Sequence, residues 1–445
     1  MLLKNLKKTD REIYKFEKAE EKRQLEGLEL IPSENYTSPA VMEAMGSILT
    51  NKYSEGYPHK RYYGGNEFVD GVEDLAIKRA KELFGVSHAN VQPYSGSPAN
   101  LAVYLATCAP GDSIMGLNLP DGGHLTHGWK VSATAIFYQS HPYHVKEDGR
   151  IDIEELRKLT KEYQPKLIWA GATAYPYKYD YKAFADIAES VGAYLAVDIA
   201  HVAGLIVAGV HPDPVPYAHI ITSTTHKTLR GPRGGLILVT KKGLEKDPDL
   251  ASKIDKAVFP GLQGGPHDHQ TAAIAVALKE ANSPQFRKYG KKVVSNAKIL
   301  AKTLKDGGIK LVSGGTENHL ILLDLVPILG PGGGVFAQIA LEEAGMTTNK
   351  NTIPMDPSSP FYPSGVRIGT PALTTRGMGK KEMQMVGKYM IEAINQIKSY
   401  RLPEKEKRKE YIKIFSRDIK KNQKIKEIHV QVKKLCKRFL VPGIN

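Results

Sequence analysis

Short apolar runs alternate with amphipathic stretches through residues 75–280 of the chain. The amphipathic stretches, such as 151–164 and 181–192, repeat their apolar positions at the spacing of a helix. The apolar runs, each about as long as a buried strand, span 89–94, 113–119, 166–171, 193–198, 219–224 and 235–240. Strands that alternate with helices predict a largely parallel sheet with helices on both faces. We therefore expect the α/β fold class for this part of the chain.

The pattern changes after residue 284. Residues 285–308 read as one long helix that ends at glycines. Beyond it, GIKLVSGG and NHLILLDL predict strands, and QIALEEAGM and KKEMQMVGKYMIEAINQIKSY predict helices, so we expect a smaller α+β domain. A proline-rich loop, 349–365, carries no periodic pattern and is expected to lack regular structure.

These patterns divide the chain into three parts. We expect an N-terminal helical arm over 1–30, a large domain over 31–283, and a small C-terminal domain with a basic tail over 284–445. Leu6, Ile13 and Phe16 give the arm an apolar face, which would pack on another surface such as a second subunit.

Composition places the chain among ordinary globular proteins, with 445 residues, of which 41% are hydrophobic and 24% charged. Two cysteines, Cys108 and Cys436, are too few for a disulfide framework or a zinc site, and this favours a reducing compartment such as the cytoplasm. No apolar run approaches the length of a membrane-spanning helix. The N-terminal residues lack the apolar core of a secretory signal.

The net charge of +15 is concentrated near the C-terminus, because residues 401–445 hold fifteen Lys/Arg and five Asp/Glu. Two interpretations remain open. The tail can be a solvated basic helical face, or it can contact a polyanion, either nucleic acid or a polyglutamylated small molecule. No aromatic-rich RNA motif, zinc finger or helix-turn-helix pattern accompanies the charge, so we expect no nucleic-acid partner for the main function.

The densest chemical signal surrounds Lys227, in AHIITSTTHKTLRGPRGG (218–235). An apolar run that ends in Ser/Thr and turns glycine-rich predicts a buried strand leaving its sheet. A poorly solvated lysine there would have a lowered pKa, and its neutral amine could form a Schiff base with an aldehyde such as pyridoxal phosphate. The ordinary alternative is a surface lysine at a strand end.

Other strand ends test this hypothesis, because ligands of open α/β sheets bind outside the carboxyl ends of the strands. The run 193–198 ends at Asp198, whose carboxylate could keep a proton on a pyridine nitrogen or simply cap a turn. His201 follows and could meet the ring hydroxyl or the ring face. After 89–94, SGSPAN opens a helix whose small residues suit a phosphate, although a plain capped helix would look the same.

Two more strand ends add flat and polar side chains. The segment PDGGHLTHG (120–128) offers His124 and His127, but no Cys/His/Asp cluster at ligand spacing accompanies them, so we expect no metal. His124 is better suited to stacking on a flat ring. Thr173 and Tyr175 follow the run 166–171 at the same edge. A phosphate cup, a ring stacker, an acid and a Schiff-base lysine on one edge predict a pyridoxal-phosphate enzyme.

Several long segments resemble serine hydroxymethyltransferase, a pyridoxal-phosphate family of the aspartate-aminotransferase fold type, over about residues 10–400. The segments are LELIPSENYTSP, LTNKYSEGYPHKRYYGG, VQPYSGSPAN, PDGGHLTHG, VDIAHVAGLI, TTHKTLRGPRGG, FPGLQGGP and SGVRIGTPA. The resemblance implies a mostly parallel pyridoxal-phosphate-binding domain, a smaller α+β domain, and a homodimer with shared active sites, with a tetramer as an open alternative.

The resemblance also implies roles for individual residues. Lys227 would carry the cofactor as an internal aldimine, Asp198 would face the pyridine nitrogen, and His124 would stack on the ring. The other implied cofactor contacts are His201 near the ring hydroxyl, Ser95, Gly96, Ser97, Thr173, Thr224 and His226, with Tyr53, Gly264 and Gly265 from the partner subunit. For the substrate, the implied residues are Arg367 and Ser33 at the carboxylate, His201, and Glu55 and Tyr63 from the other subunit. Tetrahydrofolate would be bordered by Leu119, Gly123, Leu125 and Asn351.

The implied activity is reversible transfer of the hydroxymethyl carbon of L-serine to tetrahydrofolate, giving glycine and 5,10-methylenetetrahydrofolate through aldimine and quinonoid intermediates. The implied catalytic set is Lys227, Glu55, His124, Tyr63 and Asp198, with Glu55 as the best candidate for proton transfer. Two alternatives remain at this point. One is a folate-independent aldolase for 3-hydroxy amino acids, against which Glu55, Asn351 and the GGHLTHG loop argue. The other is an RNA-binding protein that uses the basic C-terminus.

Overall fold

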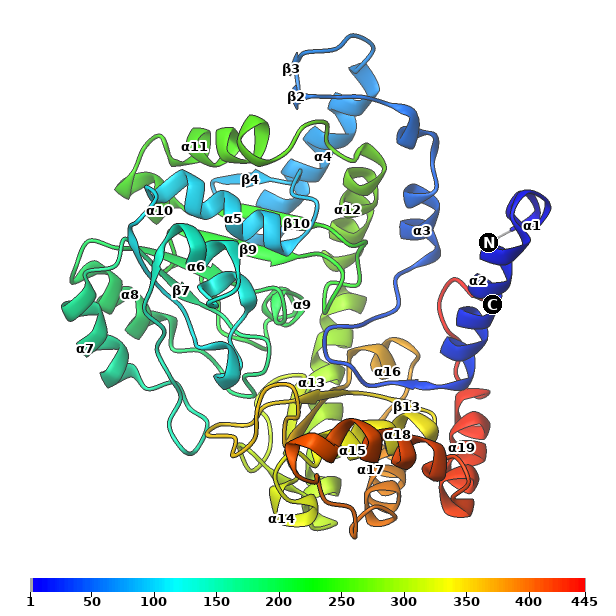
Figure 1. The fold of residues 1–445 in the computed structure, drawn as a ribbon. Helices are drawn as coiled ribbons and strands as arrows, with labels where there is room; N and C mark the ends of the chain where they lie inside the picture. Colours follow the sequence, from blue (N-terminus) through cyan, green and yellow to red (C-terminus); the bar gives the residue numbers. More distant parts are fainter. Residues whose placement is uncertain (1–2, 445) are drawn as a thin grey trace. The chain divides into compact units, whose positions relative to one another are not determined.

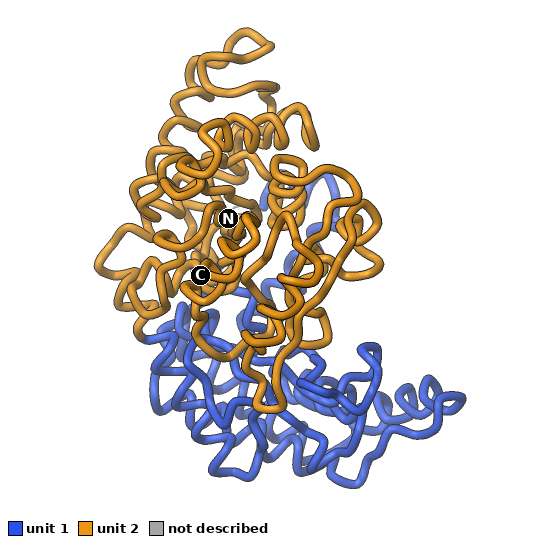
Figure 2. The backbone as a smooth tube through the Cα atoms, turned by 90° about the vertical axis from the view of Figure 1, so that its left-hand side faces the viewer, with its two compact units in different colours: residues 1–36, 292–445 blue, residues 37–291 orange. Residues whose placement is uncertain are grey.

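The computed structural model describes residues 3–444, and the chain divides into two compact units (Figure 2). Unit 1 combines 1–36 with 292–445, and unit 2 is formed by 37–291. The N-terminal arm therefore groups with the C-terminal part of the chain. The division falls inside helix α13 (Pro284–Asp306), close to the boundary that the sequence suggested after residue 283.

Unit 2 is built on a seven-stranded sheet in the order β4-β10-β9-β8-β7-β5-β6. Its strands are β4 (His88–Asn90), β5 (Ser113–Met115), β6 (Gln139–Ser140), β7 (Leu167–Ala170), β8 (Tyr194–Asp198), β9 (Ile220–Thr224) and β10 (Gly235–Val239). All neighbours run parallel except β10, which is antiparallel to both β4 and β9. The predicted mostly parallel α/β architecture is confirmed.

Helices cover this sheet (Figure 1), and two of them begin at aspartates that cap the first turn. Helix α7 (Ile153–Tyr163) starts at Asp152, whose carboxylate accepts hydrogen bonds from two amides of the first turn. Helix α8 (Tyr181–Glu189) starts at Asp180, whose carboxylate accepts one such bond. Helices α5 (Gly96–Thr107) and α11 (Leu250–Lys256) bury small and branched side chains against the strands, in a core centred on Trp169.

Two predicted strands are shorter in the structure, and one strand was not predicted. The run 113–119 forms a strand only over Ser113–Met115, and a short 3-10 helix begins at Leu119. The run 89–94 pairs in the sheet only as far as Asn90, and 91–94 leave it toward α5. Strand β6 was not predicted, because two residues are too short to show an alternating pattern.

Unit 1 contains a four-stranded antiparallel sheet in the order β11-β12-β15-β14. The strands are β11 (Lys310–Leu311), β12 (Leu320–Asp324), β14 (Asn349–Asn351) and β15 (Gly365–Gly369). Helices α15 (Gly334–Glu343) and α17 (Lys380–Asn395) share its apolar core. The expectation that 349–365 lacks regular structure was wrong at its start, where β14 pairs with β15 and supplies an edge of the sheet.

The two ends of the chain also belong to unit 1. The arm forms α1 (Lys4–Thr9) and α2 (Arg11–Glu26), and its Ile13 and Phe16 are 52% and 73% exposed. The basic tail forms α18 (Arg408–Ile419) and α19 (Gln423–Cys436), which bury Phe415 and other apolar side chains in the unit 1 core. The tail is therefore a folded element whose lysines largely face outward.

Cys108 and Cys436 both carry free thiols. Among the described residues, no helix combines the length and the apolarity that crossing a bilayer demands.

Candidate active site

A cavity opens at the carboxyl edge of the unit 2 sheet, where β8 ends at Asp198 and β9 ends three residues before Lys227. Parallel pairing of Asp198 with Thr222 brings these two strand ends together. The cavity is lined by Gly96, His124, His127, Ala172, Thr173, Asp198, Ala200, His201, Thr224 and Lys227. Seven residues that the sequence assigned to the cofactor therefore surround one space, which we name the lysine cavity.

Asp198 is held as an anion by its neighbours. Its Oδ2 accepts hydrogen bonds from Asn100 Nδ2 at 2.9 Å and His127 Nε2 at 3.2 Å, and its Oδ1 accepts one from the Ala200 amide at 3.0 Å. Burial alone would raise the pKa of Asp198, but the hydrogen bond from His127 and nearby positive charges lower it below its usual value. A buried carboxylate that stays ionised is suited to stabilising a proton on a ring nitrogen.

His124 is a neutral flat ring in this cavity. Burial, with a further contribution from His127, lowers the pKa of His124 to about 4. Its Nδ1 lies 2.7 Å from the hydroxyl oxygen of Thr126 and accepts the Thr126 amide at 3.3 Å, which leaves Nε2 to carry the proton. An uncharged imidazole can stack on an aromatic cofactor without repelling a protonated ring.

The first turn of α5 forms a cradle for an anion. Ser95 stands at the N-cap but its side chain makes no capping hydrogen bond, which leaves the Gly96 and Ser97 amides uncapped. Pro98 has no N–H, and the Ala99 amide donates to the Ser95 carbonyl at 3.1 Å. A Cβ on Gly96 would lie 2.7 Å from Thr224 Cγ2, so only glycine leaves this space open. The Thr224 hydroxyl is buried with no hydrogen-bond partner among the described residues. Bare amides and an orphaned hydroxyl fit the phosphate of pyridoxal phosphate.

His226 and Ser97 stand beside this cavity rather than in its lining. His226 precedes Lys227, and burial followed by the Lys227 charge lowers the pKa of His226 to about 3. Ser97 is exposed one residue into α5.

The loop that carries His124 is fixed by its glycines. The Thr173 hydroxyl donates to the Gly123 carbonyl at 2.9 Å, and the Thr173 amide donates to the Gly122 carbonyl at 2.7 Å. A Cβ on Gly123 would lie 1.9 Å from the Leu117 carbonyl oxygen, which excludes any larger residue. The predicted folate residues Leu119, Gly123 and Leu125 all belong to this loop, and Leu125 is half exposed.

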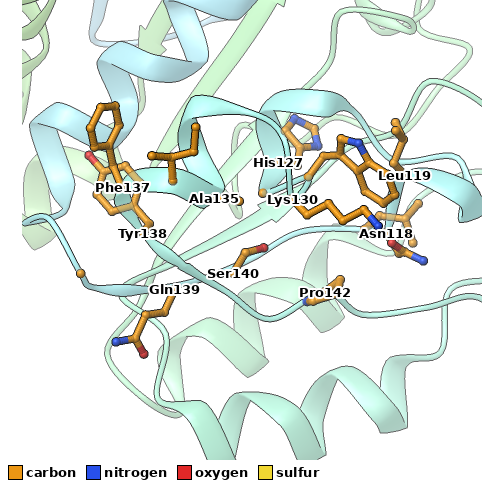
Figure 3. A pocket seen from close by; sticks show the side chains of 15 residues that line it. Asn118, Leu119, His127, Lys130, Ala135, Phe137, Tyr138, Gln139, Ser140 and Pro142 are labelled. Carbon is orange, nitrogen blue, oxygen red and sulfur yellow. The ribbon is translucent and has the colours of Figure 1, made fainter.

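A second cavity of about 680 Å³ lies along the same loop (Figure 3). His127 and Leu119 line it together with Trp129, Phe137 and Ser140. His127 thus belongs to both cavities, with its ring stacked on Trp169 at a centroid distance of 4.9 Å. Of the predicted folate residues only Leu119 lines the larger cavity.

His124, His127 and Asp198 also form a group whose ligand atoms lie within 4.8 Å of one another. Such a group could in principle hold a cation. Here its atoms take part in the hydrogen bonds to Thr126 and Asn100 described above. The absence of a metal stays a prediction.

Five predicted residues gather elsewhere in unit 2, outside the lining of the lysine cavity. Tyr53 donates to Glu55 Oε1 at 3.1 Å and packs edge-on against Tyr63 at 5.0 Å between centroids. Gly264 and Gly265 adjoin Glu55 and Tyr53, since a Cβ on either glycine would lie 3.3 Å from them. Tyr53 and Tyr63 are about half exposed.

Arg367 lies in the middle of β15 in unit 1. It is 9% exposed, and its Nε donates to Asn349 Oδ1 at 3.1 Å on the neighbouring strand β14. Burial lowers the pKa of Arg367 to about 10. Ser33 follows Pro32, which packs against Gly369 at the end of the same strand. Asn351 is the last residue of β14.

Sequence reasoning missed three residues that hold the predicted ones in place: Asn100, His127 and Asn349. Asn100 lies one helical turn after Gly96 on α5, so its offset from the predicted phosphate cup was a usable signal. His127 was considered only as a metal ligand. Asn349 could not be found, because its strand was read as loop.

Known proteins resemble this chain along most of its length. A family model described as serine hydroxymethyltransferase matches residues 6–390. A serine hydroxymethyltransferase of Sorangium cellulosum is 53% identical over 444 residues, covering 100% of this chain and 98% of that protein. A protein of the same name from Acidothermus cellulolyticus is 57% identical over 385 residues, covering 86% of this chain and 88% of that protein. A third, from Helicobacter pylori, is 55% identical over 397 residues, covering 89% of this chain and 94% of that protein.

Proposed function

The chain belongs to the serine hydroxymethyltransferase family, and on that premise we propose the part that each site residue plays in its reaction. The enzyme depends on pyridoxal phosphate and interconverts L-serine and glycine, with tetrahydrofolate as the one-carbon co-substrate. The observation that carries the assignments is the lysine cavity, where Lys227, Asp198 and His124 meet the bare α5 N-terminus.

Lys227 would hold the cofactor through its side-chain nitrogen. Asp198 would stabilise a proton on the ring nitrogen, and the neutral His124 ring would stack on the cofactor ring. Ser95, Gly96 and Ser97 would hold the phosphate, assisted by Gly264 and Gly265 of the partner subunit, and the Thr224 hydroxyl, which has no hydrogen-bond partner among residues 3–444, lies beside them. Thr173 and His226 would also contact the cofactor, with His201 near the ring hydroxyl. When bound, pyridoxal phosphate supplies an electron sink for the carbon that loses or gains the hydroxymethyl group.

Arg367 orients the substrate by holding its carboxylate in a bidentate fork, with Ser33 beside it. Glu55 moves the proton of the serine hydroxyl, and Tyr63 contacts the substrate nearby. Leu119, Gly123, Leu125 and Asn351 border tetrahydrofolate.

A homodimer is part of the proposal, with Tyr53, Glu55, Tyr63, Gly264 and Gly265 serving the partner's site. The grouping of these residues on an exposed face outside their own lysine cavity supports it. So do the exposed Ile13 and Phe16 of the arm. A cytoplasmic location is proposed from the two free thiols.

Replacement of the anchor tests these assignments. We expect Lys227→Ala to abolish serine-dependent formation of methylenetetrahydrofolate and the absorbance of covalently bound cofactor. Lys241→Ala, which changes an exposed lysine on α10 (Lys241–Lys246), is the matched control and should retain both. Undiminished turnover by Lys227→Ala would show that the anchor is misassigned. Comparing threonine cleavage with and without tetrahydrofolate separates this activity from a folate-independent aldolase.

A further inference from the structure

Glu55 sits at the start of a short hairpin formed by β2 (Gly56–Tyr57) and β3 (Lys60–Arg61). The Arg61 side chain contacts the backbone where this hairpin begins. Its Nη1 donates to the Ser54 carbonyl at 2.9 Å and to the Gly56 carbonyl at 3.0 Å. One guanidinium nitrogen therefore fixes the backbone on both sides of Glu55.

Arg61 is itself held from two further directions. Its Nε donates to Asp70 at 2.8 Å and its Nη2 to Glu73 at 2.7 Å, both on α4 (Glu67–Phe84). The side chain is only 3% exposed. Although burial opposes it, the charge of Glu73 and the two carboxylate hydrogen bonds raise the pKa of Arg61. Arg61 is thus a buried, permanently charged clamp with little freedom to move.

A buried glutamine joins this clamp to the residues that precede the phosphate cradle. Gln92 is 2% exposed, and its Nε2 donates to the Gly56 carbonyl at 2.9 Å and to Glu73 at 2.8 Å. The backbone carbonyl of Gln92 accepts a hydrogen bond from Gln263 Nε2 at 2.9 Å. The side-chain oxygen of Gln263, Oε1, accepts one from the Tyr94 amide at 3.0 Å. Tyr94 directly precedes Ser95.

We propose that Arg61 is a positioning residue for Glu55, and that Gln92 links this clamp to the phosphate cradle so that the two elements hold their places as one unit. The proposal rests on the proposed role of Glu55. Neither Arg61 nor Gln92 lines the lysine cavity. Each acts only through the backbone at Ser54 and Gly56 and through the segment before Ser95.

The chemistry of the clamp explains why arginine stands there. The three nitrogens of the Arg61 guanidinium donate four hydrogen bonds, two to backbone carbonyls and two to carboxylates. A lysine keeps the charge but has one nitrogen, which cannot meet all four acceptors at once. Arg61→Lys should therefore release Glu55 without removing the positive charge that Asp70 and Glu73 require.

A double-mutant cycle on Glu55→Gln and Arg61→Lys tests the first half of the proposal. We expect Arg61→Lys to lower kcat by up to about 100-fold, the scale of a small misplacement of a catalytic group. The KM for serine should change little. If Arg61 acts through Glu55, the double variant should be no slower than Glu55→Gln alone. A purely structural role predicts that the two losses multiply.

The second half is tested with Gln92→Met, which removes the link without leaving a charge unpaired. Gln92→Met removes two side-chain hydrogen bonds, and we expect the dissociation constant of the cofactor to rise about tenfold. We also expect kcat to fall at saturating cofactor. Gln270→Met is the matched control, because Gln270 is also buried and donates to the Pro93 carbonyl at 3.2 Å but, among residues 3–444, makes no hydrogen bond to the hairpin. It should leave kcat at saturating cofactor unchanged.

Each outcome decides one statement. If Glu55→Gln leaves kcat unchanged, the proposed role of Glu55 fails, and this inference fails with it. If Glu55→Gln is slow and the losses multiply, only the positioning role of Arg61 is overturned. Should Arg61→Lys not fold, the same cycle with Gln92→Met in its place gives the decision. Equal loss of kcat in Gln92→Met and Gln270→Met would overturn the link.

Discussion

The phosphate cradle can be tested by adding one methyl group. In Gly96→Ala the new Cβ would lie 2.7 Å from Thr224 Cγ2, about 1 Å closer than the ~3.5–4.0 Å separation of carbon atoms in ordinary contact. Thr224 is β-branched and buried at the end of a central strand, so it has few other rotamers to adopt. Any rotation that relieves the contact also displaces its orphaned hydroxyl.

The expected magnitude follows from this overlap. Overpacking by one methyl group costs roughly 1–3 kcal/mol. Part of this cost should appear as a lower free energy of unfolding of the apoprotein. The rest should weaken cofactor binding, because the phosphate requires the α5 amides and the Thr224 hydroxyl in their original places. We expect the cofactor dissociation constant to rise by roughly 5- to 100-fold, since about 1.4 kcal/mol corresponds to a factor of ten.

The assay is titration of apoprotein with pyridoxal phosphate, read by absorbance, together with urea unfolding. Thr224→Ser removes Cγ2 but keeps the hydroxyl, so the double variant Gly96→Ala/Thr224→Ser should regain most of the affinity. Gly71→Ala is the control, because Gly71 lies in α4 with no atom within 4 Å of its added Cβ, and should gain stability from helix propensity. Normal cofactor affinity in Gly96→Ala, or no rescue by Thr224→Ser, would refute the reasoning.

Three further predictions concern buried polar groups. Arg376→Met should lower the free energy of unfolding by about 3–5 kcal/mol in urea, because five backbone carbonyls of unit 1 would each lose a hydrogen bond from the guanidinium. Arg417→Met, an exposed control, should change it by less than about 0.5 kcal/mol. Burial, aided by the Lys178 charge, lowers the pKa of His211 from 6.5 to about 3, so stability is full above pH 6.5 and falls as the pH drops from 6.5 toward 3. His211→Phe should therefore flatten that part of a stability–pH profile, and an unchanged slope would contradict the assignment. Asp198→Asn should retain the cofactor but lower kcat about 1000-fold in steady-state kinetics. A much smaller decrease in kcat would contradict the assignment of Asp198 to the ring nitrogen.

The parts of the site that the sequence predicted are those tied to strand ends. Asp198 and Lys227 each follow an apolar run, and parallel strands necessarily bring such ends to one edge. Their meeting with His124 and Gly96 in one cavity is the geometric consequence of that edge. The fold class followed from the same alternation of runs and helices.

The residues that the sequence did not reveal act across long distances in the chain. Asn100 reaches Asp198 over 98 positions, and Gln92 reaches Gln263 over 171. No local periodicity encodes such contacts, because an amide at a helix or strand position looks the same whether it faces water or a buried partner. The start of 349–365 was misread for a similar reason, since β14 is polar and defined only by its pairing with β15.

The folded tail has a practical consequence for protein engineering. Since α18 and α19 bury Phe415, Ile419 and Ile428 in unit 1, a variant truncated at residue 400 would lose core side chains together with its positive charge. If the truncated variant failed to bind a polyanion, the cause could therefore be the damaged core of unit 1 rather than the lost positive charge. Charge exchange at exposed positions such as Lys409 and Lys413 leaves the packing in place. Those substitutions, rather than deletion, separate the electrostatics of the tail from its contribution to the fold.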